Sequence, residues 1–83
     1  MLYEFFGTEC PHCLNMKPII EQLKKEGVQV ESYEVWHNND NAHKLEQFDE
    51  GHCGGVPFFI NPNTKKWICG EATLEELKAI ATE

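Results

Sequence analysis

The sequence contains no arginine and few basic residues of any kind. Its 83 residues carry seven Lys against fourteen Asp and Glu, a formal net charge of -7 at pH 7. Phosphate groups would repel such a surface, so we expect no nucleic-acid partner and no anionic membrane partner. No apolar run approaches the roughly 18–20 residues that span a bilayer. The N-terminus shows no secretory signal pattern, so the sequence predicts a cytoplasmic protein with one domain, residues 1–83.

Apolar residues alternate with polar ones in some segments and recur at helical spacing in others. This patterning predicts strands at Leu2–Phe6, Val28–Trp36, Val56–Ile60 and Lys66–Cys69. It predicts helices at Pro11–Glu26 and Ala42–Asp49, and a last helix capped by Thr73. The resulting order, β-α-β-α-β-β-α, is typical of an α/β fold with a four-stranded mixed sheet and helices on both faces.

Four cysteines are present, and two of them lie two residues apart at the start of a predicted helix. These are Cys10 and Cys13, and the others are Cys53 and Cys69. Backbone N–H groups and the positive end of the helix dipole favour a thiolate at the first position. Cys10 could then attack a substrate disulfide, and Cys13 could resolve the mixed disulfide.

The same spacing also forms half of many zinc sites. A zinc site would need a second pair of ligands at similar spacing. His52 and Cys53 are the nearest couple, and no spacer separates them. A C-x-x-C between a strand and a helix favours redox chemistry, so we expect no metal or other cofactor.

The chain resembles the thioredoxin superfamily, especially its small members of glutaredoxin-like length, over essentially all 83 residues. The residues that carry the resemblance are Cys10-Pro11-His12-Cys13 with Pro18 five residues further on, Gly55-Val56-Pro57, and Gly70 before the capped last helix. The resemblance implies a thioredoxin fold and reduction of protein disulfides. It also implies disulfide-containing protein substrates, a reductase that recharges the protein, and a monomer.

The resemblance implies a role for each matching residue. Cys10 would be an exposed nucleophile and Cys13 a buried resolving thiol, with Pro11 and His12 completing the motif. Pro57 would be cis and face the disulfide. An extended substrate segment would pair with the backbone beside it, at Gly55 and Val56, with Gly70 nearby.

Two charged side chains near the motif leave alternatives open. Glu4, six residues before Cys10, occupies the place of a buried acid that helps deprotonate Cys13, or it is a solvated strand carboxylate. A protonated His12 near the thiolate would stabilise the reduced form. Glu9 would oppose this if it lay close, but its simpler interpretation is a side chain that points to water.

The remaining cysteines and tryptophans have structural interpretations. The resemblance places Cys53 where an aliphatic side chain usually lies, so we expect it to be a small buried hydrophobe. Cys69 is expected to be an inert strand thiol, with a regulatory thiol or a metal ligand as the alternatives. Trp36 and Trp67 are expected to be packing residues, and His37 and His52 to be solvated.

Two other functions remain as alternatives to disulfide reduction. One is a metal- or iron–sulfur-binding glutaredoxin-like module with Cys10 as a ligand. The other is a disulfide oxidase or isomerase, which His12 favours. A glutathione-dependent enzyme is disfavoured, because Gly7 stands where glutaredoxins usually carry Lys.

Overall fold

The structure is a computed structural model, and it describes residues 1–82. Its elements are β1 (Leu2–Phe6), α1 (Pro11–Lys25), β2 (Val30–Glu34), α2 (Asn39–Asp49), β3 (Phe58–Ile60), β4 (Trp67–Cys69) and α3 (Leu74–Ala81). This succession confirms the order predicted from the sequence.

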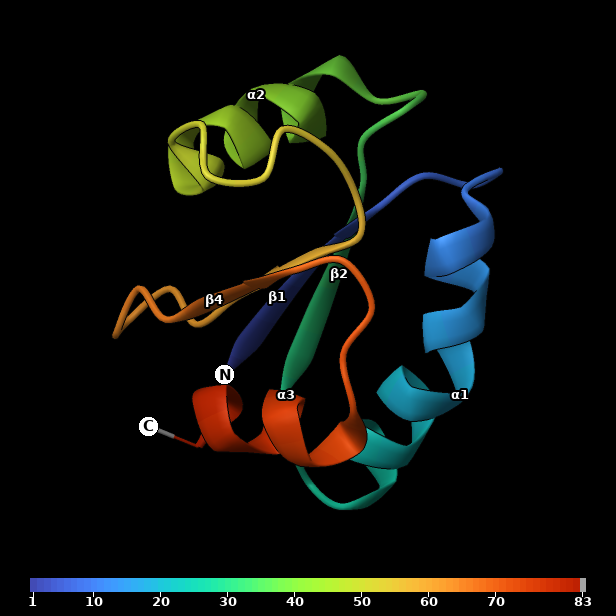
Figure 1. Ribbon diagram of the computed structural model, residues 1–83, viewed down its shortest axis with the longest axis vertical. Coiled ribbons are helices and arrows are strands. Elements are labelled where there is room, and N and C mark those ends of the chain that lie inside the picture. The colour runs from blue at the N-terminus through green and yellow to red at the C-terminus, as the bar shows by residue number, and fades with distance from the viewer. Residues whose placement is uncertain (83) are drawn as a thin grey trace.

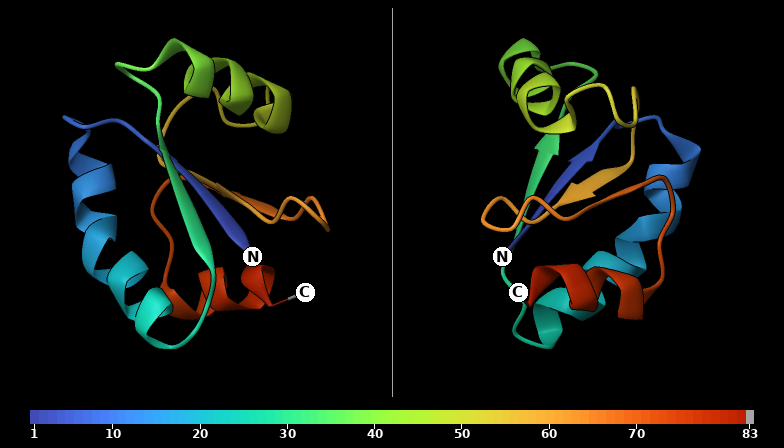
Figure 2. Two further views of the ribbon diagram at one scale, coloured as in Figure 1. Left: turned by 180° about the vertical axis from the view of Figure 1, so that it is seen from behind. Right: turned by 60° about the vertical axis from the view of Figure 1, so that its left-hand side comes forward.

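The four strands form one mixed sheet in the order β2-β1-β3-β4. Strands β1 and β2 are parallel, whereas β1 with β3 and β3 with β4 are antiparallel. Helices α1 and α3 cover one face of the sheet, and α2 covers the other (Figure 1; Figure 2). The predicted α/β architecture is therefore confirmed.

Side-chain alternation along β1 sends successive residues to opposite faces of the sheet. Leu2 packs among buried residues of α1 and α3, and Phe5 packs on the α2 side. The first core cluster comprises Leu2, Met16, Ile20, Leu23, Phe59, Ala72, Leu77 and Ala81. The second comprises Phe5, Val35, Phe58 and Ile60, with Tyr3, Tyr33, Phe48, Cys53 and Val56 among the side chains packed against it. Each face of the sheet thus has its own core.

Several element boundaries differ from the predicted ones. Strand β2 is shorter than predicted, because its five residues pair with the five residues of β1. Strand β3 begins after Pro57, since only Phe58–Ile60 pair with β1. Helix α2 begins at Asn39, because the Asn38 side chain accepts from the Asn41 N–H at 3.0 Å and caps it. Within residues 1–82, no helix is long and apolar enough to cross a membrane.

Candidate functional site

Cys10 is the N-cap of α1. Its Sγ accepts a hydrogen bond from the Cys13 N–H at 3.2 Å. Pro11 follows in the first turn, where a missing N–H leaves no helical hydrogen bond unmade. The N–H group and the helix dipole both favour negative charge on Sγ. The helix start therefore places a thiolate-stabilising environment at Cys10.

Cys10 is nevertheless buried, with only 4% of its surface exposed. The expectation of an exposed nucleophile is therefore wrong. Its Sγ donates to the carbonyl oxygen of Val56 at 3.9 Å. Val56 is joined to Pro57 by a cis peptide bond, the isomer that the resemblance implies.

The loop around Pro57 brings together several of the predicted binding residues. The carbonyl of Pro57 accepts from the Gly70 N–H at 2.8 Å, so the segment before α3 lies against it. Gly55 is exposed next to Val56. The structure thus brings Val56, Pro57 and Gly70 together, with Val56 in contact with Cys10.

Cys13 lies one turn into α1 and is 3% exposed. Burial raises the pKa of the Cys13 thiol to about 12, and its hydrogen bond with Cys10 adds to the rise. Cys13 is therefore a neutral thiol at pH 7. It needs a proton acceptor before it can act as a nucleophile.

Glu4 supplies a buried carboxyl group on the same side of the sheet. It is 6% exposed, so the alternative of a solvated strand carboxylate is wrong. The Ser32 hydroxyl donates to it at 2.7 Å. Burial raises the pKa of Glu4, while Ser32 and the nearby Lys24 and Lys17 oppose that rise.

A half-open cleft of about 270 Å³ connects Glu4 with Cys13. Strands β1 and β2 form one wall, and α1 forms the other. Lys17, Lys24 and Glu21 line it together with Ser32. The cleft gives Glu4 and Cys13 a shared path to water, and the negative charge of Glu4 contributes to the raised pKa of Cys13.

The imidazole of His12 pairs with the carboxylate of Glu71. Its Nδ1 lies 2.6 Å from a carboxylate oxygen of Glu71, which also accepts from the Asn15 side chain at 3.3 Å. The hydrogen bond from His12, followed by that from Asn15, lowers the pKa of Glu71. The imidazole is therefore held by Glu71, a partner that the sequence did not indicate, and stabilisation of the Cys10 thiolate by His12 stays a prediction.

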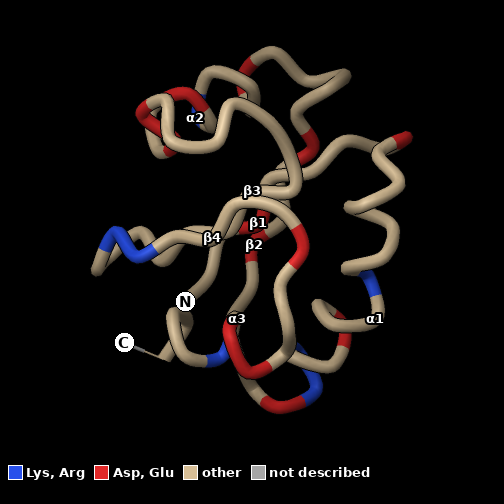
Figure 3. The backbone as a smooth tube through the Cα atoms, in the orientation of Figure 1, with Lys and Arg blue, Asp and Glu red and all other residues tan. Residues whose placement is uncertain are grey.

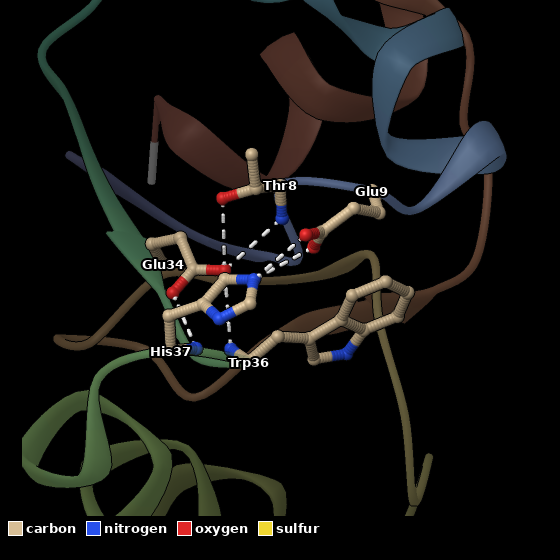
Figure 4. Close-up of polar contacts among 5 residues, drawn as sticks. All are labelled: Thr8, Glu9, Glu34, Trp36 and His37. Atoms are coloured by element: carbon tan, nitrogen blue, oxygen red, sulfur yellow. Dashed lines mark hydrogen bonds and ion pairs between the residues drawn. The ribbon is translucent and has the colours of Figure 1, made fainter.

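A carboxylate network holds the turn that precedes Cys10 (Figure 4). Glu34 accepts from the backbone N–H of Thr8 at 3.0 Å and from that of His37 at 2.8 Å. Partial desolvation opposes ionisation, but these donors outweigh it and lower the pKa of Glu34. Glu9 does not point freely to water, because its carboxylate pairs with His37 Nε2 at 2.8 Å. The turn is thus fastened to the loop after β2.

The Glu9–His37 pair predicts a pH-dependent contact beside the motif. The hydrogen bond to Glu9 raises the pKa of His37. Since the folded pKa lies above the unfolded one, the pair is complete below the ordinary His pKa and is lost as the pH rises through the raised value. Imidazole proton shifts in an NMR titration should show His37 titrating at a higher pH than free His. Glu9→Gln should return the midpoint to the ordinary range, and a midpoint unmoved by that change would contradict the pairing.

Cys53 and Cys69 form a disulfide, with their Cα atoms 5.5 Å apart. The expectations of a buried hydrophobe and an inert thiol are therefore wrong. Cys53 is half-buried against the α2-side core, and Cys69 is exposed at the end of β4. Cys10 and Cys13 are both free thiols. The even number of cysteines and the predicted hairpin, which returns Cys69 toward the loop before β3, were the signals that could have indicated the bond.

Both tryptophans pack against neighbours at the surface. Trp36 is 51% exposed and Trp67 is 39% exposed. The Trp36 indole packs against Gly7 and leaves no room there for an added Cβ. Trp67 stacks on the imidazole of His52, with ring centroids 4.8 Å apart, so His52 is not simply solvated.

The described part of the chain contains no group of three or more His, Cys, Asp or Glu side chains placed to hold a metal ion. No family model and no curated protein matches the sequence. Among solved structures, the chain is similar to the crystal structure of the T8A mutant of the thioredoxin-like protein BC3987. The two share 18% sequence identity, and the match covers 96% of this chain and 97% of that one with a TM-score of 0.68. The chain therefore has a thioredoxin-like fold.

Proposed function

We propose that this protein is a cytoplasmic thiol–disulfide oxidoreductase that reduces protein disulfides through Cys10 and Cys13. One observation carries the proposal. The Sγ of Cys10 caps α1 and accepts the N–H of Cys13, which places the two thiols within one helical turn. A thiolate at a helix N-terminus beside a second thiol has the chemistry of a reversible dithiol–disulfide pair.

In the first step, the Cys10 thiolate attacks one sulfur of a substrate disulfide. A new bond joins Cys10 to the substrate, and the other substrate sulfur leaves as a thiolate. The Cys13 N–H and the helix dipole stabilise the attacking thiolate.

In the second step, Cys13 attacks the Sγ of Cys10. The Cys10–Cys13 disulfide forms, and the second substrate thiolate leaves. Because the pKa of Cys13 is raised to about 12, its proton must be removed during the attack. Glu4 is a suitable proton acceptor, since it shares the cleft with Cys13 and its raised pKa makes it a stronger base than an ordinary carboxylate. A dithiol reductant then returns the pair to its reduced form.

The surroundings of Cys10 favour a particular kind of substrate. The backbone of Val56 lies beside the thiol and would pair with an extended segment that carries the substrate disulfide. Glu9 directly precedes Cys10 and Glu71 pairs with His12, so both bring negative charge to the N-terminal end of α1. The backbone at that end of the helix is coloured for acidic and not for basic residues (Figure 3). Segments with basic or apolar residues next to their disulfide should therefore bind better than acidic ones.

The proposal predicts that Cys13→Ser traps substrates. With dithiothreitol as electron donor, the wild-type protein should reduce insulin disulfides. Mixed with insulin in the absence of dithiothreitol, the reduced Cys13→Ser variant should complete the first step and stop, because a hydroxyl at this position cannot displace the substrate. Intact-mass measurement should show a substrate adduct that maps to Cys10. Absence of wild-type activity, or adducts on another residue, would contradict the proposal.

Glu4→Gln should slow the second step about 100-fold and leave the first step unchanged. Gln has nearly the same shape but cannot accept the proton of Cys13. Rapid mixing with a labelled disulfide peptide separates the two steps, because the first leaves a mixed disulfide and the second releases a thiol.

Glu21→Gln is the matched control for this measurement. Glu21 lines the same cleft but is exposed, so its replacement should change neither step. Because folding raises the pKa of Glu4, its ionisation opposes folding, and Glu4→Gln should be at least as stable as the wild type. Equal second-step rates in the two variants would exclude Glu4 as the acceptor.

A further inference from the structure

The Cys53–Cys69 disulfide lies next to the residues that cover Cys10. Cys53 precedes Val56 by three residues, and Val56 contacts the thiol of Cys10. Cys69 directly precedes Gly70, whose N–H donates a hydrogen bond to the carbonyl oxygen of Pro57. The bond therefore connects the two chain segments that meet beside the nucleophile.

The loop at residues 50–55 has few other attachments to the sheet. The N–H groups of Cys53 and Gly54 donate to the carboxylate of Asp49 at 2.6 and 2.8 Å, and that of His52 to its carbonyl at 2.9 Å. These bonds fold the loop onto the end of its own helix and do not fix it to β4. Contact with β4 comes from the disulfide and from the stacking of His52 on Trp67.

The two sulfurs differ in their surroundings. Cys69 is exposed, whereas Cys53 is half-buried and packs on the α2-side core. An exposed disulfide is open to attack by a thiolate, and exposed disulfides tend to be the labile or regulatory ones. Disulfides of proteins that stay in a reducing compartment such as the cytosol are usually transient.

We propose that Cys53–Cys69 is a second thiol–disulfide exchange site, which takes electrons from an external dithiol and whose opening uncovers Cys10. This inference rests on the proposed function only for the role of Cys10. The observations that carry it are the 4% exposure of Cys10, its contact with the carbonyl oxygen of Val56, and the accessible disulfide that joins the loop before Val56 to the end of β4.

The exchange proceeds in two balanced steps. A thiolate of the dithiol attacks the Sγ of Cys69, and Cys53 leaves as a thiolate that takes up a proton. The mixed disulfide now joins the reductant to Cys69. The second thiol of the reductant loses its proton and attacks the reductant sulfur in that bond, and Cys69 leaves as a thiolate that takes up a proton. The dithiol becomes a disulfide, and the pair gains two electrons and two protons.

The exchange is tested in a Cys10→Ser/Cys13→Ser variant, in which only Cys53 and Cys69 remain. Reduced glutathione, a monothiol, should form an adduct that maps to Cys69 and not to Cys53. Dithiothreitol should then make both thiols reactive to N-ethylmaleimide while circular dichroism still shows the folded protein. A bond that resists reduction until denaturant is added, or that opens only together with global unfolding, would overturn the proposal. Neither result depends on any activity of Cys10.

The uncovering of Cys10 is tested by its alkylation rate in Cys13→Ser. Iodoacetamide should modify Cys10 at least about five-fold faster when Cys53–Cys69 is reduced than when it is bonded. Cys13→Ser/Cys53→Ala/Cys69→Ala should match the reduced form. Cys13→Ser/Trp67→Ala, which loses the ring stack but keeps the bond, should match the bonded form. Peptide mapping separates Cys10 from the new thiols, so the comparison stands even if the Ala variant does not fold. Equal rates in bonded and reduced protein would overturn the uncovering.

Discussion

Cys10→Ser should lower the disulfide-reducing activity by more than about 1,000-fold, to the rate of dithiothreitol alone. A hydroxyl at this position is not ionised at pH 7 and cannot take the place of the thiolate nucleophile. The fold should survive the change. Ser is a preferred N-cap, so its Oγ can accept the Cys13 N–H that the sulfur accepts now.

Cys10→Ala separates the chemical effect from the structural one. It should be equally inactive but less stable by about 1 kcal/mol, because the cap is lost. Insulin reduction and urea unfolding of the two variants provide the comparison. Turnover by Cys10→Ser above the dithiothreitol background would show that another residue attacks the substrate.

Reducing Cys53–Cys69 should lower the free energy of unfolding by about 3 kcal/mol. The bond closes a loop with a sequence separation of 16, and chain-entropy arguments give a loop of about that length this stabilisation. In a chain of 83 residues, such a loss should lower Tm by more than about 10 °C. A core this small rarely supplies more than about 3–5 kcal/mol by itself, so the effect is large relative to the total.

The measurement is best made in the Cys10→Ser/Cys13→Ser background. Thermal unfolding is compared with and without dithiothreitol, so that the chain is identical in both arms and only the bond differs. The control replaces Cys53 and Cys69 with Ala in the same background, and its Tm should not respond to reductant. A Tm that is the same in both arms would contradict the stabilising role of the bond.

The local chemistry of the sequence was enough to predict the fold. Apolar periodicity and the Thr73 cap placed the elements, and Gly70 fell before the last helix as expected. The pattern could not define the strand ends, because these depend on pairing. Strand β2 ends where β1 has no more residues to pair with, and no feature within Val28–Trp36 records that limit.

The contacts of the site were harder to predict than its position. Spacing alone placed Cys10 and Cys13 at the start of α1. The disulfide between Cys53 and Cys69 depends on the β3–β4 hairpin and on the loop before it, which meet only in the folded chain. The resemblance misled here, since it suggested that Cys53 takes the place of an aliphatic side chain.

The burial of Cys10 and the pairing of His12 have the same origin. Val56 contacts the Cys10 thiol from 46 residues away along the chain, and Glu71 reaches His12 from 59 residues away. The residue types at Cys10 and His12 gave no information about these distant partners. Long-range contacts of this kind decide whether a predicted nucleophile is accessible.

The central claim is that Cys10 and Cys13 interconvert between dithiol and disulfide. The most direct measurement equilibrates the wild-type protein in buffers of reduced and oxidised glutathione, followed by acid quenching, alkylation and peptide mapping. We expect Cys10 and Cys13 to become bonded to each other and to lose their reactivity together in a reversible two-electron transition, which peptide mapping separates from any change at Cys53 and Cys69. A Cys10 that is oxidised while Cys13 stays free, or a pair that remains reduced in every buffer, would contradict the account.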